Sequence, residues 1–420
     1  MKTAIVILNW NGEKYLKKFL APILRSVQDN DAEVIVADNN STDGSVSYIE
    51  NSFEGRIRTL CLDKNYGFAE GYNKALQQID AQYYLLLNSD VWVDSHWLDA
   101  LEEWMDLHPD CAVCGPKILS YERQDEFEYA GAAGGLIDIL GYSFCRGRIM
   151  SYIEKDQGQY EMPEDTFWQS GACMMVRSSV WRELGGFDKD YFAHFEEIDF
   201  CWRAKLAHYR VCYVPRSHVF HVGGGTLPQD SPWKLKLNYR NNLLTLHKNY
   251  AKTIALRDLF ELIATLVKSS DYCGINEWEC CLRLYEELPA ELQQELLENA
   301  AKEGINSRKR IILKRKFLDV LSAFVYLVSG KTAAFKAVFQ AHREFDMLKK
   351  THAQESTESL YNYLQKSLQE DFIHKFLQLD LENGFGKKVS IKGISSHWII
   401  PYAYRYKEKV HDRINKEIKL

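Results

Sequence analysis

No stretch of this sequence is apolar over the roughly 18 to 20 consecutive residues that a membrane-spanning helix needs. The opening apolar run, AIVIL, is short, and the polar NWNG ends it without a small-residue cleavage site. The N-terminus therefore lacks the pattern of a signal peptide, and we expect a cytoplasmic protein.

The cysteines indicate neither a disulfide framework nor a zinc site. The ten cysteines are scattered. Cys111 and Cys114 form one CxxC pair and Cys280 and Cys281 are adjacent, but no second pair stands at the spacing that a zinc site needs. We expect reduced, structural thiols, which agrees with a cytosolic location.

There is also no excess of basic residues. The 420 residues include 52 Lys and Arg against 58 Asp and Glu, for a net charge of −6. We therefore expect no nucleic acid among the partners. The hydrophobic share of 46% is typical of a globular protein, and the length favours two or three domains.

What the sequence does contain is an alternation of buried strands and amphipathic helices. Apolar, β-branched runs predict the strands, and apolar residues at helical spacing predict the helices. Ser41 or Thr42 is the expected N-cap of the second helix. The predicted order is strand 3–8, helix 13–27, strand 33–37, a helix through Ile49, strand 57–62, helix 68–79 and strand 83–90. This order predicts an α/β fold with a mostly parallel sheet flanked by helices.

Polar residues follow each of the four predicted strands. They are Asn9-Trp10-Asn11, Asp38-Asn39-Asn40, Asp63-Lys64-Asn65 and Asn88-Ser89-Asp90. Open α/β sheets bind ligands outside the carboxyl ends of their strands. Four polar strand ends in register therefore indicate one shared binding site.

The rest of the chain divides into a mixed part and a helical part. Residues 110–220 predict short strands with a helix at 178–184, and from residue 234 the pattern is mainly helical. The segment GFGKKVSIKGISSHW near the end is compatible with a small hairpin. We expect three domains: residues 1–250, a helical region 251–350 with an acidic segment and a basic amphipathic helix, and a small helical or mixed tail 351–420.

The segment LLLNSDVWVD offers oxygen ligands for a cation. Asn88 and Asp90 lie two residues apart just past an apolar strand, so in an extended segment they point the same way. An amide oxygen and a carboxylate suit a hard divalent cation. The alternative is that Asp90 is a turn residue or a helix N-cap.

Two further segments carry titratable side chains. In HFEEIDF, Glu196, Glu197 and Asp199 lie among apolar residues, which favours a carboxyl with a perturbed pKa and a general-base role. The alternative is a solvated helix N-terminus, where acids are stabilised by the dipole. In SHVFHVGGGT, His221 precedes glycines that permit close approach to a ligand, but spacing does not separate it from His218.

With these residues in view, the chain resembles family 2 glycosyltransferases with the GT-A fold, in particular the bacterial rhamnosyltransferase-like branch. The resemblance covers roughly residues 3–250. It lies in six motifs in order: VILNWNG, ADNNSTDGS, NYGFAEGYN, LLLNSDV, the long segment from WQSGACMMVRSS to HFEEIDFCWRAKLAHYRVCYVP, and HVGGGT. It implies a Rossmann-like, mostly parallel sheet, and the pattern beyond it adds a mainly helical C-terminal region.

The resemblance also implies roles for individual residues. Asp90 matches the last Asp of a metal-binding DxD motif in which Asn88 replaces the first Asp, and His221 matches a metal-facing histidine. Glu197 matches the catalytic base, with Glu196 as the alternative and Asp199 beside them. Trp168 and Gly171 match the acceptor side. The implied nucleotide-sugar-binding residues are Asn9, Trp10, Asp38, Asn40, Asn65, Gly67, Phe68, Gly71, Asn73, Asn88 and Ser89.

The implied function is an inverting, metal-dependent transfer of a hexosyl or deoxyhexosyl group. The donor would be a nucleotide-diphosphate sugar, the cofactor Mg²⁺ or Mn²⁺, and the acceptor a hydroxyl of a glycan or lipid-linked glycan in cell-surface polysaccharide or glycolipid assembly. One alternative is a nucleotidyltransferase, but NWNGEKYLKK lacks the glycine-rich, basic phosphate loop. The other is a non-catalytic sugar- or nucleotide-binding protein with a degenerate site.

The segment RKRIILKRKFLDVLSAFVYLV predicts an amphipathic helix. One face carries Leu313, Phe317, Val320, Leu321, Phe324, Leu327 and Val328, and the other carries Arg315, Asp319, Ser322 and Tyr326. The apolar face either packs on the transferase domain or on a subunit partner, or lies in the interface of an anionic membrane, next to six basic residues at 308–316. The second alternative gives peripheral contact with the inner face of the cytoplasmic membrane.

Overall fold

The computed structural model describes residues 1–128, 131–138, 140–149, 152–223, 231–268, 285–286, 288–352 and 356–369, and two short strands near the end of the chain. The described residues divide into two compact units: the first is Met1–Asn238, and the second begins at Tyr239. Cys280, Cys281 and residues 271–284 of the acidic segment lie outside the described residues.

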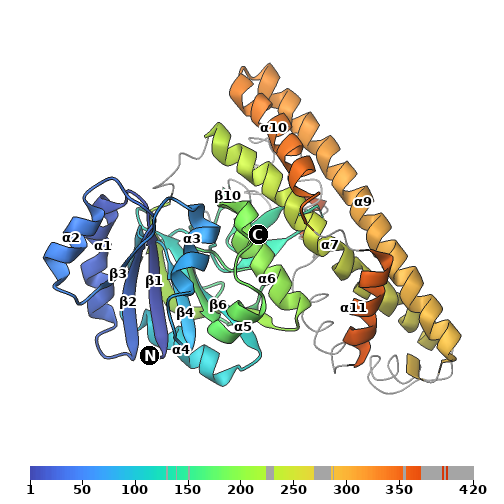
Figure 1. The fold of residues 1–420 in the computed structure, drawn as a ribbon, viewed down its shortest axis with the longest axis horizontal. Helices are drawn as coiled ribbons and strands as arrows, with labels where there is room; N and C mark the ends of the chain where they lie inside the picture. Colours follow the sequence, from blue (N-terminus) through green and yellow to red (C-terminus); the bar gives the residue numbers. More distant parts are fainter. Residues whose placement is uncertain are drawn as a thin grey trace. The chain divides into compact units, whose positions relative to one another are not determined.

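A mixed sheet forms the centre of the first unit (Figure 1). Its strand order is β11-β13-β6-β12-β4-β1-β2-β3, and β5 pairs with β13. The strands are β1 (Thr3–Asn9), β2 (Ala32–Asp38), β3 (Arg58–Cys61), β4 (Tyr83–Leu87), β5 (Val91–Val93), β6 (Cys111–Ser120), β11 (Glu164–Asp165), β12 (Cys173–Arg177) and β13 (Arg210–His221). Strands β1 to β4 pair in parallel, and β12 lies antiparallel between β4 and β6.

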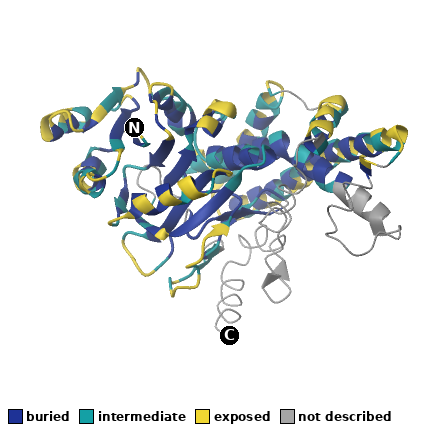
Figure 2. Ribbon diagram, turned by 90° about the horizontal axis from the view of Figure 1, so that it is seen from below, coloured by how far each residue is buried: buried dark blue, intermediate teal, exposed yellow. Residues whose placement is uncertain are grey.

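Helices cover this sheet and bury their apolar faces on it. They are α1 (Glu13–Ser26), α2 (Ser45–Phe53), α3 (Gly67–Leu76), α4 (Trp97–Leu107), α5 (Ser178–Glu183) and α6 (Glu196–Leu206). Strands β1, β2 and β4 are almost wholly buried, as continuous apolar runs on a sheet covered on both faces should be (Figure 2). The predicted fold class is confirmed.

The start of α2 differs from the prediction. Neither Ser41 nor Thr42 caps the helix, which begins at Ser45 after Gly44 and continues past Ile49 to Phe53. The side chain of Asp43 instead accepts the backbone N–H of Ser45 at 3.0 Å. Ser41 is engaged elsewhere, because its hydroxyl accepts hydrogen bonds from the first strand end.

The mixed part of the first unit contributes long strands as well as the short ones predicted. Strands β6 and β13 pair in parallel over most of their length and widen the main sheet. A separate antiparallel sheet of four short strands lies in the order β10-β9-β8-β7. These strands are β7 (Gly135–Ile137), β8 (Ser143–Cys145), β9 (Arg148–Ile149) and β10 (Tyr152–Ile153).

The second unit is helical. Its helices are the main part of α7 (Pro232–Lys268), α9 (Ala290–Val328), α10 (Thr332–Leu348) and α11 (Thr357–Gln369). Helix α9 packs against α10 and α11, and it approaches α7 closely at Gly304, where a Cβ would lie 2.5 Å from the carbonyl oxygen of Ala251. Among the described helices, none has the length and apolar character needed to cross a membrane. Near the end of the chain, Ser390–Ile391 pairs antiparallel with Ile394–Ser395, which is the small hairpin suggested by the sequence.

Candidate active site

The ends of β1 and β2 are joined by a buried polar network. Asn9 lies opposite Asp38 in the parallel register. The Asn9 side-chain amide donates to Asp38 Oδ1 at 3.0 Å and to Ser41 Oγ at 3.1 Å, and the Ser41 amide donates to Asp38 Oδ2 at 2.8 Å. Trp10 follows with 43% of its surface exposed. The network fixes the turn after β1 and leaves an aromatic ring beside it for a ligand.

Asn39 is a member of this site that the sequence reasoning missed in favour of Asn40. Asn39 is buried, and its side chain donates to Asn65 Oδ1 at 3.1 Å and to the carbonyl oxygen of Gly67 at 2.9 Å. Asn40 is exposed with a φ of 60°. The sequence does not distinguish the two adjacent asparagines. Which of them turns inward depends on the residue at which β2 ends, and this is Asp38.

The predicted nucleotide residues on α3 hold a loop in place. The carbonyl oxygen of Phe192 accepts the backbone N–H of Phe68 at 2.7 Å, and a Cβ on Gly67 would lie 2.7 Å from that same oxygen. The side chain of Asn73 donates to the carbonyl oxygen of Phe187 at 2.8 Å and accepts the amide of Phe187 at 3.0 Å. Gly71 allows the side chains of β1 to approach α3. The start of α3 is thus bound to residues 187–192.

The loop held by α3 has an unusual backbone. Phe192, His194 and Phe195 have φ values of 62°, 70° and 74°. Non-glycine residues in this left-handed region are strained, and they occur preferentially at functional sites. The strain lies immediately before Glu196, the first residue of α6.

Glu196 and Glu197 form a coupled pair of carboxyls in the first turn of α6. Glu196 is buried and Glu197 is half-buried, and an oxygen of each is buried without a hydrogen-bond partner. Burial and the neighbouring Glu197 carboxylate raise the pKa of Glu196 well above its usual range. Burial also raises the pKa of Glu197, to about 7, while a hydrogen bond from Glu196 and backbone N–H groups oppose this shift. The pair therefore holds a proton on Glu196 and ionises first at Glu197.

The position of this pair is tied to the strand ends. Burial raises the pKa of the Tyr72 hydroxyl, and Cys173 and then Glu196 add smaller contributions in the same direction. That hydroxyl donates to carbonyl oxygens of Val6 in β1 and Leu87 in β4, each at 3.3 Å. Glu196 is therefore within electrostatic reach of the strands that carry the polar network.

Asp199, the third acid of the predicted set, has a structural setting. Its carboxylate is fully buried, 2.9 Å from Arg203 Nε, and it accepts a hydrogen bond from Tyr191 at 3.3 Å. Arg203 also donates to the carbonyl oxygens of Leu184 and Gly186. A carboxylate held by a guanidinium is a poor proton acceptor, so this geometry does not support Asp199 as a base.

Strand pairing brings Asp90 and His221 together across 131 residues of sequence. Strand β13 pairs with β5 so that His221 is opposite Val91, and the amide of Val222 donates to the carbonyl oxygen of Asp90. His221 Nε2 then lies 3.1 Å from Asp90 Oδ1, and both side chains are buried. The competitor His218 lies 4.0 Å from Asp94 instead.

Glu128 completes this cluster, and the sequence reasoning missed it. Its Oε1 lies 3.5 Å from His221 Nδ1, on the opposite side of the ring from Asp90. Burial lowers the pKa of His221, but Asp90 and Glu128 outweigh it and raise the pKa to about 10. Glycine is favoured at position 223 because its φ of 71° lies in the left-handed region, and a Cβ there would also lie 2.8 Å from Glu128 Oε1. Glu128 belongs to none of the sequence motifs. It is placed at the site because its backbone N–H donates to the carbonyl oxygen of Ile118 in β6.

The cluster has the chemistry of a cation site. A histidine that binds a metal with one ring nitrogen usually donates its other N–H to a carboxylate, as the position of Glu128 allows. Asp90 and the Nε2 of His221 then supply an oxygen and a nitrogen that converge. These residues could hold a divalent cation.

The two residues before Asp90 follow the end of β4. Asn88 is half-buried, and its backbone N–H donates to the carbonyl oxygen of Ala172. Ser89 is close to the turn after β1, since a Cβ on Gly12 would lie 3.3 Å from Ser89 Oγ. Ser89 therefore borders the polar network, whereas Asn88 is bound to the segment that leads into β12.

The two predicted acceptor-side residues have packing roles in this structure. Trp168 is buried, and its indole N–H donates to the carbonyl oxygen of Leu136 at 2.9 Å. Gly171 lies against the ring of Phe68, where a Cβ would be 3.0 Å from Phe68 Cζ. Gly171 thus contacts α3, on the donor side of the predicted site.

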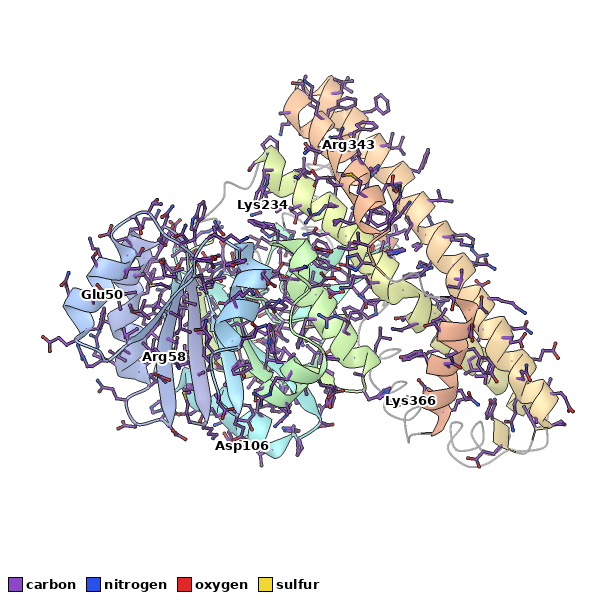
Figure 3. The ribbon with its side chains drawn as sticks, viewed as in Figure 1. Glu50, Arg58, Asp106, Lys234, Arg343 and Lys366 are labelled. Atoms are coloured by element: carbon purple, nitrogen blue, oxygen red, sulfur yellow. The ribbon has the colours of Figure 1, made fainter. Side chains whose placement is uncertain are left out.

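The first turn of α7 adds a cation that the sequence reasoning did not identify. Lys234, which is labelled in Figure 3, is half-buried, and burial lowers its pKa against the opposing effect of Glu128. Burial, and to a smaller extent the charge of Lys234, lower the pKa of His194 to about 4. The neighbouring Trp233 packs edge-on against Phe192 with ring centres 5.5 Å apart. Lys234 therefore acts electrostatically on both the Glu128 cluster and the strained loop.

Comparison with known proteins agrees with this geometry. Residues 4–185 match the sequence model of Glycosyl transferase family 2. The chain therefore carries a family 2 glycosyltransferase domain, and it is a glycosyltransferase, as its motifs predicted.

Individual relatives share about a quarter of their residues with this chain. One is an N-acetylglucosaminyl-diphospho-decaprenol L-rhamnosyltransferase of Mycobacterium tuberculosis, which is 26% identical over 261 residues. This alignment covers 58% of the present chain and 83% of the relative. It is 26% identical over 226 residues to the rhamnosyltransferase WbbL of Escherichia coli, covering 52% and 82%. Among solved structures, S. aureus TarS 1–349 in complex with UDP-GlcNAc matches with a TM-score of 0.44 and 16% identity, covering 84% of this chain and 93% of that chain.

We expect Arg203→Met to lower the free energy of unfolding by about 3–5 kcal/mol, because it leaves the buried Asp199 carboxylate without its guanidinium. Urea denaturation measures this change. The control is Arg216→Met, which breaks an exposed pair with Glu103 and should cost less than about 1 kcal/mol. Equal losses in the two variants would show that the Asp199 pair is not structural.

Proposed function

We propose that this chain transfers a sugar from a nucleotide-diphosphate sugar to a hydroxyl acceptor, with inversion at the anomeric carbon and with a divalent cation, Mg²⁺ or Mn²⁺. One observation carries the proposal. Two chemically different clusters lie near the same strand ends: Asp90 with His221 and Glu128 just past β4, and Glu196 with Glu197 after the loop that is hydrogen-bonded to the start of α3. The first cluster offers ligands for a cation, and the second offers a carboxylate that can accept a proton.

On the donor side, Asp90 and His221 would hold the cation, and Glu128 would orient the His221 ring. When bound, the cation neutralises the negative charge of the departing diphosphate. The nucleotide would lie over the strand-end network of Asn9 and Asp38, with the exposed Trp10 beside it. The Asn9 side-chain amide and the Ser41 backbone N–H donate within this network, so it serves to hold the ends of β1 and β2 in a fixed shape.

On the acceptor side, Glu197 would take the proton of the attacking hydroxyl. A base is most effective when its pKa is close to the working pH, and Glu197 meets this condition with a pKa of about 7. Glu196 stays protonated and donates to Glu197, which holds the base in one orientation. A single displacement by the hydroxyl inverts the anomeric carbon, and it requires no carboxylate nucleophile.

The relatives support a proposal for the acceptor and the pathway. The M. tuberculosis relative is named for N-acetylglucosaminyl-diphospho-decaprenol and an L-rhamnosyl group. By this likeness we place the present chain in cell-surface polysaccharide or glycolipid assembly, acting with a hexosyl or deoxyhexosyl donor on a lipid-linked glycan. Such an acceptor would locate the protein at the inner face of the cytoplasmic membrane.

We further propose that the transferase domain comprises residues 1–250, followed by a helical region 251–350 and a tail 351–420. The first compact unit, Met1–Asn238, supports the first boundary. Helix α7 continues through residue 250, so the proposed domain would end inside this helix.

We expect Glu128→Gln to weaken Mn²⁺ binding by about 10- to 100-fold, because the His221 ring loses the carboxylate that orients it. Asp90→Ala should abolish cation-dependent binding of the nucleoside diphosphate. Calorimetric titration with Mn²⁺ and the nucleoside diphosphate measures both. Asp94→Ala is the control, since Asp94 lies beside His218 rather than His221. Unaltered Mn²⁺ affinity in Asp90→Ala would refute this cation site.

We expect Glu197→Gln to reduce transfer by about 10²- to 10⁴-fold while donor binding is retained, because only the proton acceptor is lost. In the unmodified chain the rate should rise with pH through about 7, since Glu197 must be ionised to act. Glu196→Gln should stay active, because glutamine can still donate to Glu197. If Glu196→Gln is the inactive variant, the base is Glu196.

An enzyme and a non-catalytic binder are distinguished by hydrolysis of the donor. We expect slow release of the nucleoside diphosphate from the cognate donor, lost in Asp90→Ala. Thermal-shift screening of nucleotide sugars with and without Mn²⁺ would identify that donor. Donor binding without transfer or hydrolysis under any tested condition would favour the binding protein.

A further inference from the structure

Helix α9 exposes its apolar face. Leu313, Phe317 and Phe324 are 69%, 62% and 51% exposed, and Leu321, Leu327 and Val328 are exposed beside them. Of the thirteen large hydrophobic side chains that are exposed in the described part of the chain, eight lie between Leu313 and Met347. Exposed apolar groups gathered in this way mark an interaction surface.

The opposite, polar face of α9 is the buried one, which explains this orientation. Arg315 Nε lies 2.7 Å from Asp319 Oδ1, and Asp319 Oδ2 lies 3.1 Å from Nε2 of His342 on α10. Arg315 and Asp319 are almost fully buried. A buried charge pair is costly to break, so this network fixes which face of α9 meets α10. The apolar face is therefore not the packing face within the helical unit.

The apolar surface continues from α9 onto α10. Phe335 packs against Phe324 with ring centres 6.0 Å apart and against Phe339 at 5.0 Å. Phe339 and Met347 are exposed on α10. We call the exposed side chains Leu313, Phe317, Leu321, Phe324, Leu327, Val328, Phe339 and Met347 the apolar ridge. On α9 it extends over about 22 Å at 1.5 Å per residue.

The charges that accompany the ridge are mostly basic. Between residues 305 and 350 the charged residues that are exposed over the whole residue are Lys309, Arg310, Lys314, Lys331, Lys336, Arg343 and Lys350. Among the acids of this segment, Asp319 is buried, and Asp346, whose side chain is 44% exposed, is paired with Lys316 and Lys349; Figure 3 labels Arg343 on α10. At 100° per residue, Lys309 and Arg310 lie on the same face of α9 as Leu313 and Phe317. Two of the six basic residues predicted to flank the ridge, Arg308 and Arg315, are buried instead.

We propose that the apolar ridge and its basic rim bind the surface of an anionic phospholipid membrane. Apolar side chains enter the boundary between headgroups and acyl chains, and the basic residues contact the anionic headgroups. A second copy of the chain fits this surface less well. A two-fold contact would set the mostly basic rims of the two copies against each other, and the acids beside them, Glu303 and Asp346, are already paired within the chain. This surface would supply the membrane location of the proposed function.

The test is co-sedimentation of the full chain with vesicles, in the absence of donor and acceptor. We expect binding to vesicles that contain phosphatidylglycerol, little binding to pure phosphatidylcholine, and weaker binding as salt rises. The triple variant Lys309→Gln, Arg310→Gln, Lys314→Gln should lower the partition coefficient by roughly a hundredfold, at about fivefold per basic residue. The double variant Phe317→Glu, Phe324→Glu should lose binding at all salt concentrations.

Matched controls come from the transferase unit. Lys17, Arg123 and Lys155 are basic residues with 54%, 63% and 61% of their side chains exposed, and their triple change to Gln should leave vesicle binding unaltered. Leu107→Glu, at an apolar side chain that is 68% exposed, should do the same. Circular dichroism of each variant verifies that its helices are retained.

Two outcomes would overturn the proposal. One is absence of binding to phosphatidylglycerol vesicles at low salt. The other is concentration-dependent dimerisation in solution that Phe317→Glu, Phe324→Glu abolishes, which would assign the ridge to a second copy of the chain. Neither outcome bears on the transferase activity, because Mn²⁺ and donor binding are measured separately in solution.

Discussion

The antiparallel pairing of β13 with β5 is the constraint on which the candidate site depends. It places His221 opposite Val91 and so beside Asp90, although the two residues are far apart in the chain. The parallel pairing of β13 with β6 then brings Glu128 to the other side of the imidazole ring. A slip of one residue would turn His221 to the opposite face of the sheet. The candidate cation site therefore results from strand register rather than from any local motif.

A second constraint joins the donor side to the acid pair. The backbone of Phe192 accepts the first amides of α3, and Asn73 holds Phe187, so α3 and the strained loop before α6 form one structure. Residues predicted to contact a nucleotide are used here to position Glu196 and Glu197. Strain in this loop is offset by these hydrogen bonds, which keeps the two buried carboxyls beside the strand ends.

Much of the fold could be predicted from the sequence, because it depends on local patterns. The apolar runs of β1, β2 and β4 predicted the parallel sheet, and the polar residues after them predicted the edge at which the candidate site lies. Glu128, Asn39 and the pairing of β13 could not be predicted, since each depends on register between segments distant in sequence. Helix α9 shows a different limit. Its periodicity gave the two faces correctly, but only the buried pair of Arg315 with Asp319 decides which face is turned inward.

The central claim is that Asp90 and His221 hold the cation that seats the donor diphosphate. The most direct measurement is a crystal structure with Mn²⁺ and a nucleoside diphosphate, in which anomalous scattering locates the metal. We predict an anomalous peak at about 2.0–2.3 Å from an Asp90 carboxylate oxygen and from His221 Nε2, with Glu128 on Nδ1 of the same ring. A diphosphate bound with its Mn²⁺ away from both residues would contradict the account.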